Sequence, residues 1–312
     1  MSLILGQLRQ HTVEFIAGTG IVFDGVRTDA SSTSGPWTWH TPDGCLSGYV
    51  DGCGGGGGGG GGSSSTTEAA GGGGGGSAMS VANFPINWAK GAVLTISLGA
   101  AGTGGAAGAN GTNGGDTLIS GLLSNQFSAV PFAGAAGEIR LSGSTGGKAA
   151  TTSASGAGGN AGQAAASSYV AIEAGGAGVS NGATAISGNH GLEYIQSFFG
   201  TVYCSSGASG GNASTTVTVA GGVGGAAQIA FGASYGTFPA YQSGGQNGTT
   251  SWGGGGIGGA SLFGLPGVGA TGLGVAPANA TGFGAGGTGG NGQAAGSNGS
   301  IGYLKITYWS AV

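Results

Sequence analysis

Charged side chains are scarce in this chain: Asp, Glu, Lys and Arg make up 5% of its 312 residues, and the net charge is −4. Its six basic residues provide no electrostatic footprint for nucleic acid, which needs a basic surface. No acidic, basic or histidine side chain occurs between Tyr194 and Leu304. The surface of this part must be hydrated through backbone amides and Ser, Thr and Asn side chains, or be buried against another copy of the chain.

Cysteines and long apolar runs are also few. Cys45, Cys53 and Cys204 are an odd number at irregular spacing, which argues against a disulfide framework and fits assembly in a reducing cytoplasm. Cys45 and Cys53 could pair across a turn, but small buried side chains are the favoured interpretation. No run reaches the roughly eighteen apolar residues of a membrane-spanning helix, and residues 1–7 lack the basic lead-in of a signal peptide, so we expect no membrane insertion.

The sequence has little that points to catalysis. Its three histidines, His11, His40 and His190, stand in no catalytic motif. The match of residues 207–211 to the G-x-S-x-G pattern of hydrolases lacks the strand-turn-helix context that exposes the serine. Metal sites need clustered His, Cys or carboxylate side chains, and the sequence shows no such cluster. We therefore expect no enzymatic activity, no cofactor and no metal.

Glycine is what the chain has in abundance, with 82 residues. Such a content is usual in disordered low-complexity segments. Disorder, however, pairs low hydrophobicity with high charge, whereas 39% of this chain is hydrophobic and little of it is charged. The composition therefore favours an ordered chain.

Short strands are predicted around two long glycine runs. Trp37–His40 alternates aromatic and polar residues, which is typical of a half-buried strand, and a Pro-Asp-Gly turn leads to a second strand at Leu46–Asp51. The nine glycines Gly54–Gly62 follow, and after a polar loop come the six glycines Gly71–Gly76. The chain is expected to go out on the first run and to return on the second.

Further strands are predicted before and after these runs. They are His11–Ile16, Gly20–Phe23, Val93–Leu98 and Ile301–Trp309. The segment Val81–Ile86 contains Pro85, which limits it to an edge strand or an extended loop. We expect the terminal strand Ile301–Trp309 to pair with the early strands near Trp37 and Tyr49.

Elsewhere, glycine recurs at every third residue. The rows are Gly99–Gly114, Gly156–Gly162, Gly253–Gly259, Gly284–Gly290 and, after a skip at Gln293, Gly296–Gly302. Polyproline-II-type helices have three residues per turn and about 3.1 Å rise, so glycine at every third position lets a neighbouring helix approach. Collagen has the same period, but the chain has only seven prolines. The sequence therefore predicts an all-β fold in which short antiparallel strands frame packed polyglycine II-type helices, with no significant α-helix.

The order of these segments resembles the glycine-rich domain of bacteriophage tail fibres and tail-fibre adhesins. The shared pattern spans about residues 36 to 310 and ends in a strand after Asn298-Gly299. Its other elements are Trp37-Thr38-Trp39, Pro42-Asp43-Gly44, Leu46–Asp51, Gly54–Gly62, Val93–Leu98 and Asn113–Thr117. Cys45 and Gly48 depart from it, because that family usually has β-branched residues there, and residues 120–250 have no clear counterpart.

The resemblance implies a virion structural protein of the phage tail that is assembled in the host cytoplasm and mediates attachment to the host cell surface. Residues 1–35 would be a connector to other tail or baseplate proteins, and residues 36–312 the glycine-rich fibre domain. The chain would form a homotrimer or act as a monomeric tip adhesin, and the two alternatives remain open. Its receptor would be a glycan or an outer-membrane protein.

In that family, loops projecting from the glycine scaffold bind the receptor. Here the candidates are aromatic residues where glycine thins out, since aromatics offer large contacts at low entropic cost. They are Tyr194, Phe198, Phe199, Tyr203, Tyr235, Phe238, Tyr241 and Trp252. For any single one of them, a place in the core or in a trimer seam is the more frequent alternative. A non-viral glycine-rich surface protein and an ice-binding polyglycine protein are the alternative functions.

Overall fold

The computed structural model describes residues 8–29, 35–65, 69–123, 137–151, 193–196, 201–205, 253–270 and 272–311, with a few single glycines between 156 and 210. These residues contain strands and no α-helix, and hence no helix able to cross a membrane. The strands are β1 (Leu8–Ile16), β2 (Gly20–Phe23), β3 (Val26–Asp29), β4 (Trp37–His40), β5 (Ser47–Cys53), β6 (Ser80–Asn87), β7 (Val93–Ser97), β8 (Thr117–Ser120), β9 (Glu138–Leu141), β10 (Glu193–Gln196), β11 (Thr201–Ser205), β12 (Phe263–Leu265), β13 (Thr281–Phe283) and β14 (Tyr303–Ala311).

The larger sheet has eight strands in the order β10-β11-β6-β5-β14-β1-β2-β3, and all its pairs are antiparallel. Strand β14 lies near the middle and pairs with β1 along its whole length, from Leu8 opposite Ala311 to Ile16 opposite Tyr303. Residues 8–29 are thus part of this sheet. The prediction of an all-β fold with antiparallel strands is confirmed.

The smaller sheet has the order β4-β7-β8-β9 and is also antiparallel. It corrects one expected pairing. The terminal strand does pair with β5, where Thr307 lies opposite Tyr49, but it does not pair with the strand of Trp37. That strand, β4, pairs with β7, and the Trp37 ring crosses the core to reach Phe15, with 5.9 Å between ring centroids. Trp37 therefore packs against the sheet that contains the terminal strand, while its own strand belongs to the other sheet.

The two sheets pack face to face around one hydrophobic core. The larger sheet contributes buried residues such as Phe15, Val50, Ile86 and Leu304, and the smaller sheet contributes Trp37, Leu94, Ile96, Ile119 and Ile139. Trp88 closes this core at one end, where its ring N–H donates to the carbonyl of Cys45 at 2.8 Å. A side chain at Gly48 would place its Cβ 2.9 Å from the Trp88 ring and 2.6 Å from the Thr307 carbonyl. This contact explains why glycine replaces the β-branched residue expected at position 48.

Cys53 in β5 and Cys45 just before β5 do not form a disulfide bond. Cys45 and Cys53 are both free and buried, and they stand at opposite ends of the strand. Burial raises the pKa of the Cys53 thiol, so it stays protonated. The interpretation as small buried side chains is confirmed for both.

Pro85 lies in β6 opposite Tyr49 of β5. The other neighbour of β6, β11, pairs with Ser80, Val81 and Ala82 only. At Pro85, strand β6 therefore pairs with β5 but not with β11, which suits a residue that has no N–H to donate.

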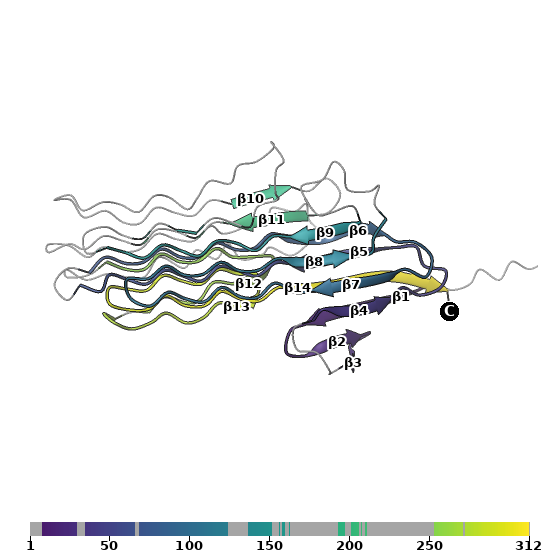
Figure 1. The fold of residues 1–312 in the computed structure, drawn as a ribbon, viewed down its shortest axis with the longest axis horizontal. Coiled ribbons are helices and arrows are strands. Elements are labelled where there is room, and N and C mark those ends of the chain that lie inside the picture. The colour runs from purple at the N-terminus through teal and green to yellow at the C-terminus, as the bar shows by residue number, and fades with distance from the viewer. Residues whose placement is uncertain are drawn as a thin grey trace, which may run out of the picture.

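Glycine segments continue the strands away from the sandwich. Figure 1 shows the larger and the smaller sheet toward one end and undulating segments running from them toward the other. Strand β5 runs into residues 54–63, and the chain returns through residues 69–77 to β6. Residues 99–115 link β7 to β8 in the same out-and-back manner, and residues 284–300 lead from β13 to β14. We call these segments together the glycine array.

Residues 54–63, the central segment, are hydrogen-bonded on all sides. Their N–H groups donate in rotation to three antiparallel segments, 109–115, 294–300 and 70–76. Their carbonyl groups accept in rotation from three more, 102–108, 144–150 and 287–293. Bonds to any one neighbour recur every third residue, with N–O distances of 2.7–3.2 Å. This is the repeat that packed three-residue helices require, and it satisfies the backbone groups that glycine leaves bare.

The six neighbours explain the uninterrupted glycine run. A Cβ at any position from Gly55 to Gly62 would lie 1.9–2.2 Å from a backbone carbonyl oxygen of an adjacent segment. Segment 99–108, at the edge of the array, differs: Gly102 and Gly105 meet other backbones, while Thr103 and Ala106 are exposed. Consecutive glycines therefore mark interior segments, and glycine at every third residue marks a segment at the boundary.

Asparagine and aspartate side chains complete the array where no backbone carbonyl reaches. The Oδ1 atoms of Asn110, Asn113 and Asp116 accept hydrogen bonds from three N–H groups of residues 143–149, at 2.8–3.1 Å. Their three-residue spacing puts them on one face of their segment. Each side-chain oxygen accepts the hydrogen bond that a backbone carbonyl of a neighbouring segment accepts in the interior of the array.

Candidate functional site

The predicted receptor-contacting aromatics fall mostly outside the described residues. This applies to Phe198, Phe199, Tyr235, Phe238, Tyr241 and Trp252. Tyr194 and Tyr203 lie on the paired strands β10 and β11 at one edge of the larger sheet, where Tyr194 is opposite Cys204 and Tyr203 is opposite Ile195. The backbone thus brings two of the eight onto neighbouring strands. A role in receptor binding stays a prediction for all of them.

Phe263, another aromatic among glycines, has a structural place. Its ring centroid lies 5.6 Å from that of Tyr303, and Phe283 stacks on the same ring at 4.7 Å. The three rings join the β12–β13 hairpin to the last strand. Burial, followed by the nearby Glu14 carboxylate, raises the pKa of the Tyr303 hydroxyl, which keeps the ring neutral in this contact.

The turns of the glycine array gather at the end away from the sandwich, and we call this end the distal tip. It comprises residues 63–65, 106–109, 272–275 and 291–294. The backbone N–H of Gln293 donates to the Ser63 carbonyl at 2.7 Å, and the Gln293 amide donates to the Ser65 carbonyl at 2.8 Å. Gly108 donates to the last glycine of the central segment, and Gly274 donates to the carbonyl of Gly292. Turns that lie far apart in the sequence thus form one surface.

The turn backbones have the conformations that their sequences allow. Gly108 and Gly274 have φ of 75° and 71°, a region that favours glycine, and Gln293 has φ of 65°. Gln293 is where the glycine period skips in the sequence. The skip in the glycine period is a signal of this turn in the sequence, and a search for aromatic interruptions does not find it.

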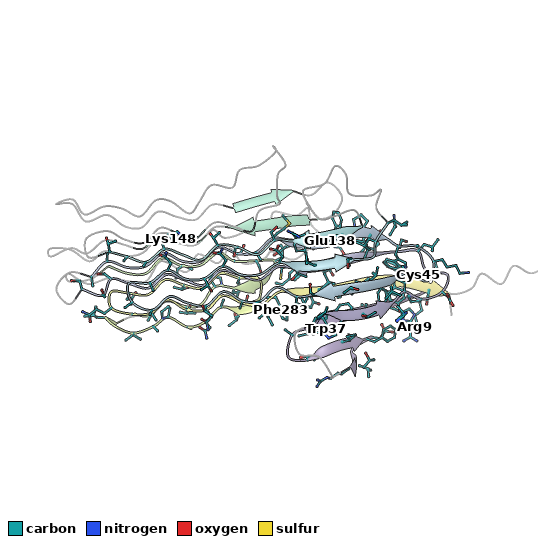
Figure 2. All side chains as sticks on the ribbon, in the orientation of Figure 1. Arg9, Trp37, Cys45, Glu138, Lys148 and Phe283 are labelled. Atoms are coloured by element: carbon teal, nitrogen blue, oxygen red, sulfur yellow. The ribbon has the colours of Figure 1, made fainter. Side chains whose placement is uncertain are left out.

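The described part of the distal tip is uncharged and presents small polar and apolar groups. Ser64 and residues 106–109 are exposed, and Leu273 and Val275 expose 45% and 52% of their surface. Lys148 is an exposed charged residue on the array, and Figure 2 shows it away from the sandwich that carries Arg9 and Glu138. The described part of the distal tip thus offers apolar area and neutral hydrogen-bonding groups to solvent.

Groups with shifted pKa values lie in the sandwich and at its junction with the array. They are Asp24, Cys53, Tyr303 and Tyr308. Burial raises the pKa of Tyr308 to about 12, and a hydrogen bond from the Thr12 N–H, followed by one from His11, lowers the pKa of Asp24. Within the described ranges no three His, Cys, Asp or Glu residues gather as a metal site would need.

No protein-family model matches the chain, and no curated protein matches its sequence. The resemblance to tail fibres therefore rests on the order of motifs in the sequence alone.

Proposed function

We propose that the chain is a bacteriophage tail fibre protein that mediates attachment to the host cell surface through loops carried by its glycine array. Its place is the virion tail. Its receptor is a glycan or an outer-membrane protein of the host.

The observation that carries the proposal is the gathering of the array's turns at the distal tip. Four out-and-back turns, from residues 63–65 to residues 291–294, meet there through hydrogen bonds around Gln293 and Gly108. Because the interior segments are bonded on all sides, their turns are held at fixed spacing without a hydrophobic core beneath them. A rigid scaffold that presents clustered turns is a common basis for recognition, since turns tolerate change while the scaffold is kept.

The proposal also assigns partners. Residues 1–35 join the chain to other tail or baseplate proteins, and copies of the chain associate as a homotrimer or the chain acts alone as a tip adhesin. The scarcity of charge supports association between copies, because an uncharged surface has little repulsion to overcome. Mass measurement of the purified protein in solution separates the trimer from the monomer.

Cell binding by a tip variant tests the proposal. Fluorescently labelled protein is added to cells of the susceptible bacterium, and bound fluorescence is measured as a function of protein concentration. Leu273→Ser removes an apolar contact at the distal tip, and we expect binding at least tenfold weaker. Val26→Ser is the matched control, since Val26 is 67% exposed on strand β3 of the sandwich, and its binding should stay within twofold of the parent.

Equal loss of binding in both variants would contradict a role for the tip, and so would full binding by both. Absence of binding by the folded parent protein would contradict attachment itself. Thermal hysteresis of ice growth by the same preparation would favour the ice-binding alternative.

A further inference from the structure

Strands β1, β2 and β3 differ from their neighbours in the larger sheet in how they connect to the glycine array. Strands β5, β6 and β14 each continue directly into a glycine segment, so the array holds the end of each strand that lies nearest to it. After β1 the chain instead turns at residues 17–19 into β2, and β2 leads to β3 at the edge of the sheet. We call residues 8–29 the N-terminal unit, and none of its strands continues into the array.

The N-terminal unit is attached to the rest of the larger sheet through one pair of strands. Every residue of β1 lies opposite a residue of β14, from Leu8 opposite Ala311 to Ile16 opposite Tyr303. Among the described residues, the other backbone hydrogen bonds of the unit run between β1, β2, β3 and their turns. The joint between β1 and β14 therefore carries any load that passes from the unit into the sheet.

The central segment of the array is bonded more densely than this joint. Each N–H from Gly54 to Ser63 donates a backbone hydrogen bond, and each carbonyl from Gly55 to Ser63 accepts one. The segment thus makes about two backbone bonds per residue, whereas an antiparallel pair such as β1 and β14 makes about one per residue. Because Figure 1 shows strands and glycine segments running along the same long direction, a pull in that direction loads both kinds of contact in shear.

A pull between β1 and the distal tip reaches the weaker contact first. At the tip, Ser64 lies in the turn between the central segment and residues 69–77, so two glycine segments share the load and pass it to β5 and β6. Strand β14 is held by β5 and by its own continuation into residues 299–302, which bond to residues 99–102. Strand β1 has no such continuation, and it therefore yields before the array does.

We propose that the N-terminal unit is a force-released connector. A pull along the molecule detaches β1 from β14, and residues 8–29 extend while the glycine array and the distal tip stay folded. The array keeps its register, because the strands that enter and leave its segments stay in their sheets. The direction of the pull rests on the proposed function, in which residues 1–35 lead to the virion and the distal tip meets the host. The order of release rests on the hydrogen bonds of the fold.

Optical tweezers test the connector on the full chain. DNA handles are attached through azide-bearing amino acids at Arg9 and Ser64, both of which are exposed, and the tether is held at constant force. The first step should add at most about 100 Å of contour length, which is the extended chain from Arg9 to β4 at ~3.5 Å per residue. The step should reverse when the force is lowered, because β14 stays in place to pair with β1 again.

A second handle pair changes only the direction of the load. Arg9 and Ser310 lie opposite each other at the end of the joint, so handles at these two positions open the strand pair one residue at a time. Handles at Arg9 and Ser64 instead load all pairs of the joint together. Release of β1 should therefore come at least tenfold sooner with the Arg9 and Ser310 handles at the same force.

Phe15→Ala weakens the joint without touching the array. Phe15 is fully buried in the core, and its truncation leaves a cavity under β1. With the Arg9 and Ser64 handles, the lifetime before the first step should shorten at least tenfold at the same force. Val26→Ala is the matched control in the same unit, because Val26 is 67% exposed, and its lifetime should stay within twofold of the parent.

Three results would overturn the inference. A first step of about 190 Å, the extended chain from Arg9 to Ser64 at ~3.5 Å per residue, would mean that the sandwich and the array yield together. Equal lifetimes for the two handle pairs would contradict loading of β1 in shear, and equal lifetimes for Phe15→Ala and the parent would contradict release at β1. None of these measurements involves a host cell, so loss of attachment and loss of stepwise extension are separate results.

Discussion

Replacing one interior glycine by alanine should destabilise the whole array. At Gly59 the new Cβ would lie 2.1 Å from the Thr288 carbonyl oxygen, which already accepts a bond from Ser297 at 2.8 Å. Carbon and oxygen cannot approach so closely, so one segment must move by about 1 Å or more. That movement leaves a buried donor and a buried acceptor unpaired at about 1–3 kcal/mol each, or about 4 kcal/mol together. The smaller backbone entropy of alanine in the unfolded chain returns at most about 1 kcal/mol.

Differential scanning calorimetry of Gly59→Ala measures this effect. A loss of about 3–4 kcal/mol corresponds to a fall in Tm of roughly 5 °C for a chain of this size. Gly272→Ala is the matched control on an outer turn, because its Cβ would meet only the Val275 side chain, at 3.0 Å, and that methyl group can rotate away. Its Tm should stay within about 2 °C of the parent. A Tm for Gly59→Ala equal to that of the control would refute the packing account.

Three further changes test other parts of the structure. Gly48→Val should lower Tm in calorimetry by roughly 3 °C or more, because the new side chain collides with the Trp88 ring and with strand β14. The pKa of Asp24 is lowered by the Thr12 N–H and by a histidine, so its contribution to stability is present above about pH 4 and is lost as the pH falls further; between pH 4 and pH 2 the Tm of the parent should therefore fall more than that of Asp24→Asn. Asn113→Ala removes the acceptor of one N–H at the array boundary and should cost about 1 kcal/mol in chemical denaturation, and an unchanged stability would show that water replaces the side chain fully.

The strands could be predicted from the sequence because they carry side chains. Alternation of apolar residues located Trp37–His40, Val93–Leu98 and Ile301–Trp309, each within a few residues of its strand. The pairing was predicted only in part. Trp37 and Tyr49 are both aromatic, and neither sequence pattern predicts which of the two sheets its strand joins. The answer depends on which face of the terminal strand packs against the core.

The glycine segments behave differently. Their three-residue period was visible in the sequence, and the out-and-back path of Gly54–Gly62 and Gly71–Gly76 agrees with the hydrogen bonds between them. Their neighbours could not be predicted, because glycine has no side chain with which to select a partner. The strands that enter and leave each segment fix its position and register. The position of consecutive glycines in the interior of the array therefore follows from their neighbours in space and not from the sequence.

The candidate site shows the same limit. The sequence pattern pointed to aromatic interruptions of the glycine segments, Tyr194, Tyr203 and six others, whereas the described turns of the distal tip consist of Ser, Ala, Gly, Leu, Val, Asn and Gln residues. Only the skip at Gln293 marked one of them in advance. Turns that meet in space from distant parts of the chain leave no common motif in the sequence.

Competition for phage adsorption tests the proposed function most directly. Cells of the susceptible bacterium are saturated with the purified, folded protein, phage carrying this chain is added, and free phage is counted over time. If the chain attaches the virion to the host, the adsorption rate should fall at least tenfold, and the Leu273→Ser variant should block far less well at the same concentration. An adsorption rate unchanged by saturating folded protein would contradict the proposal.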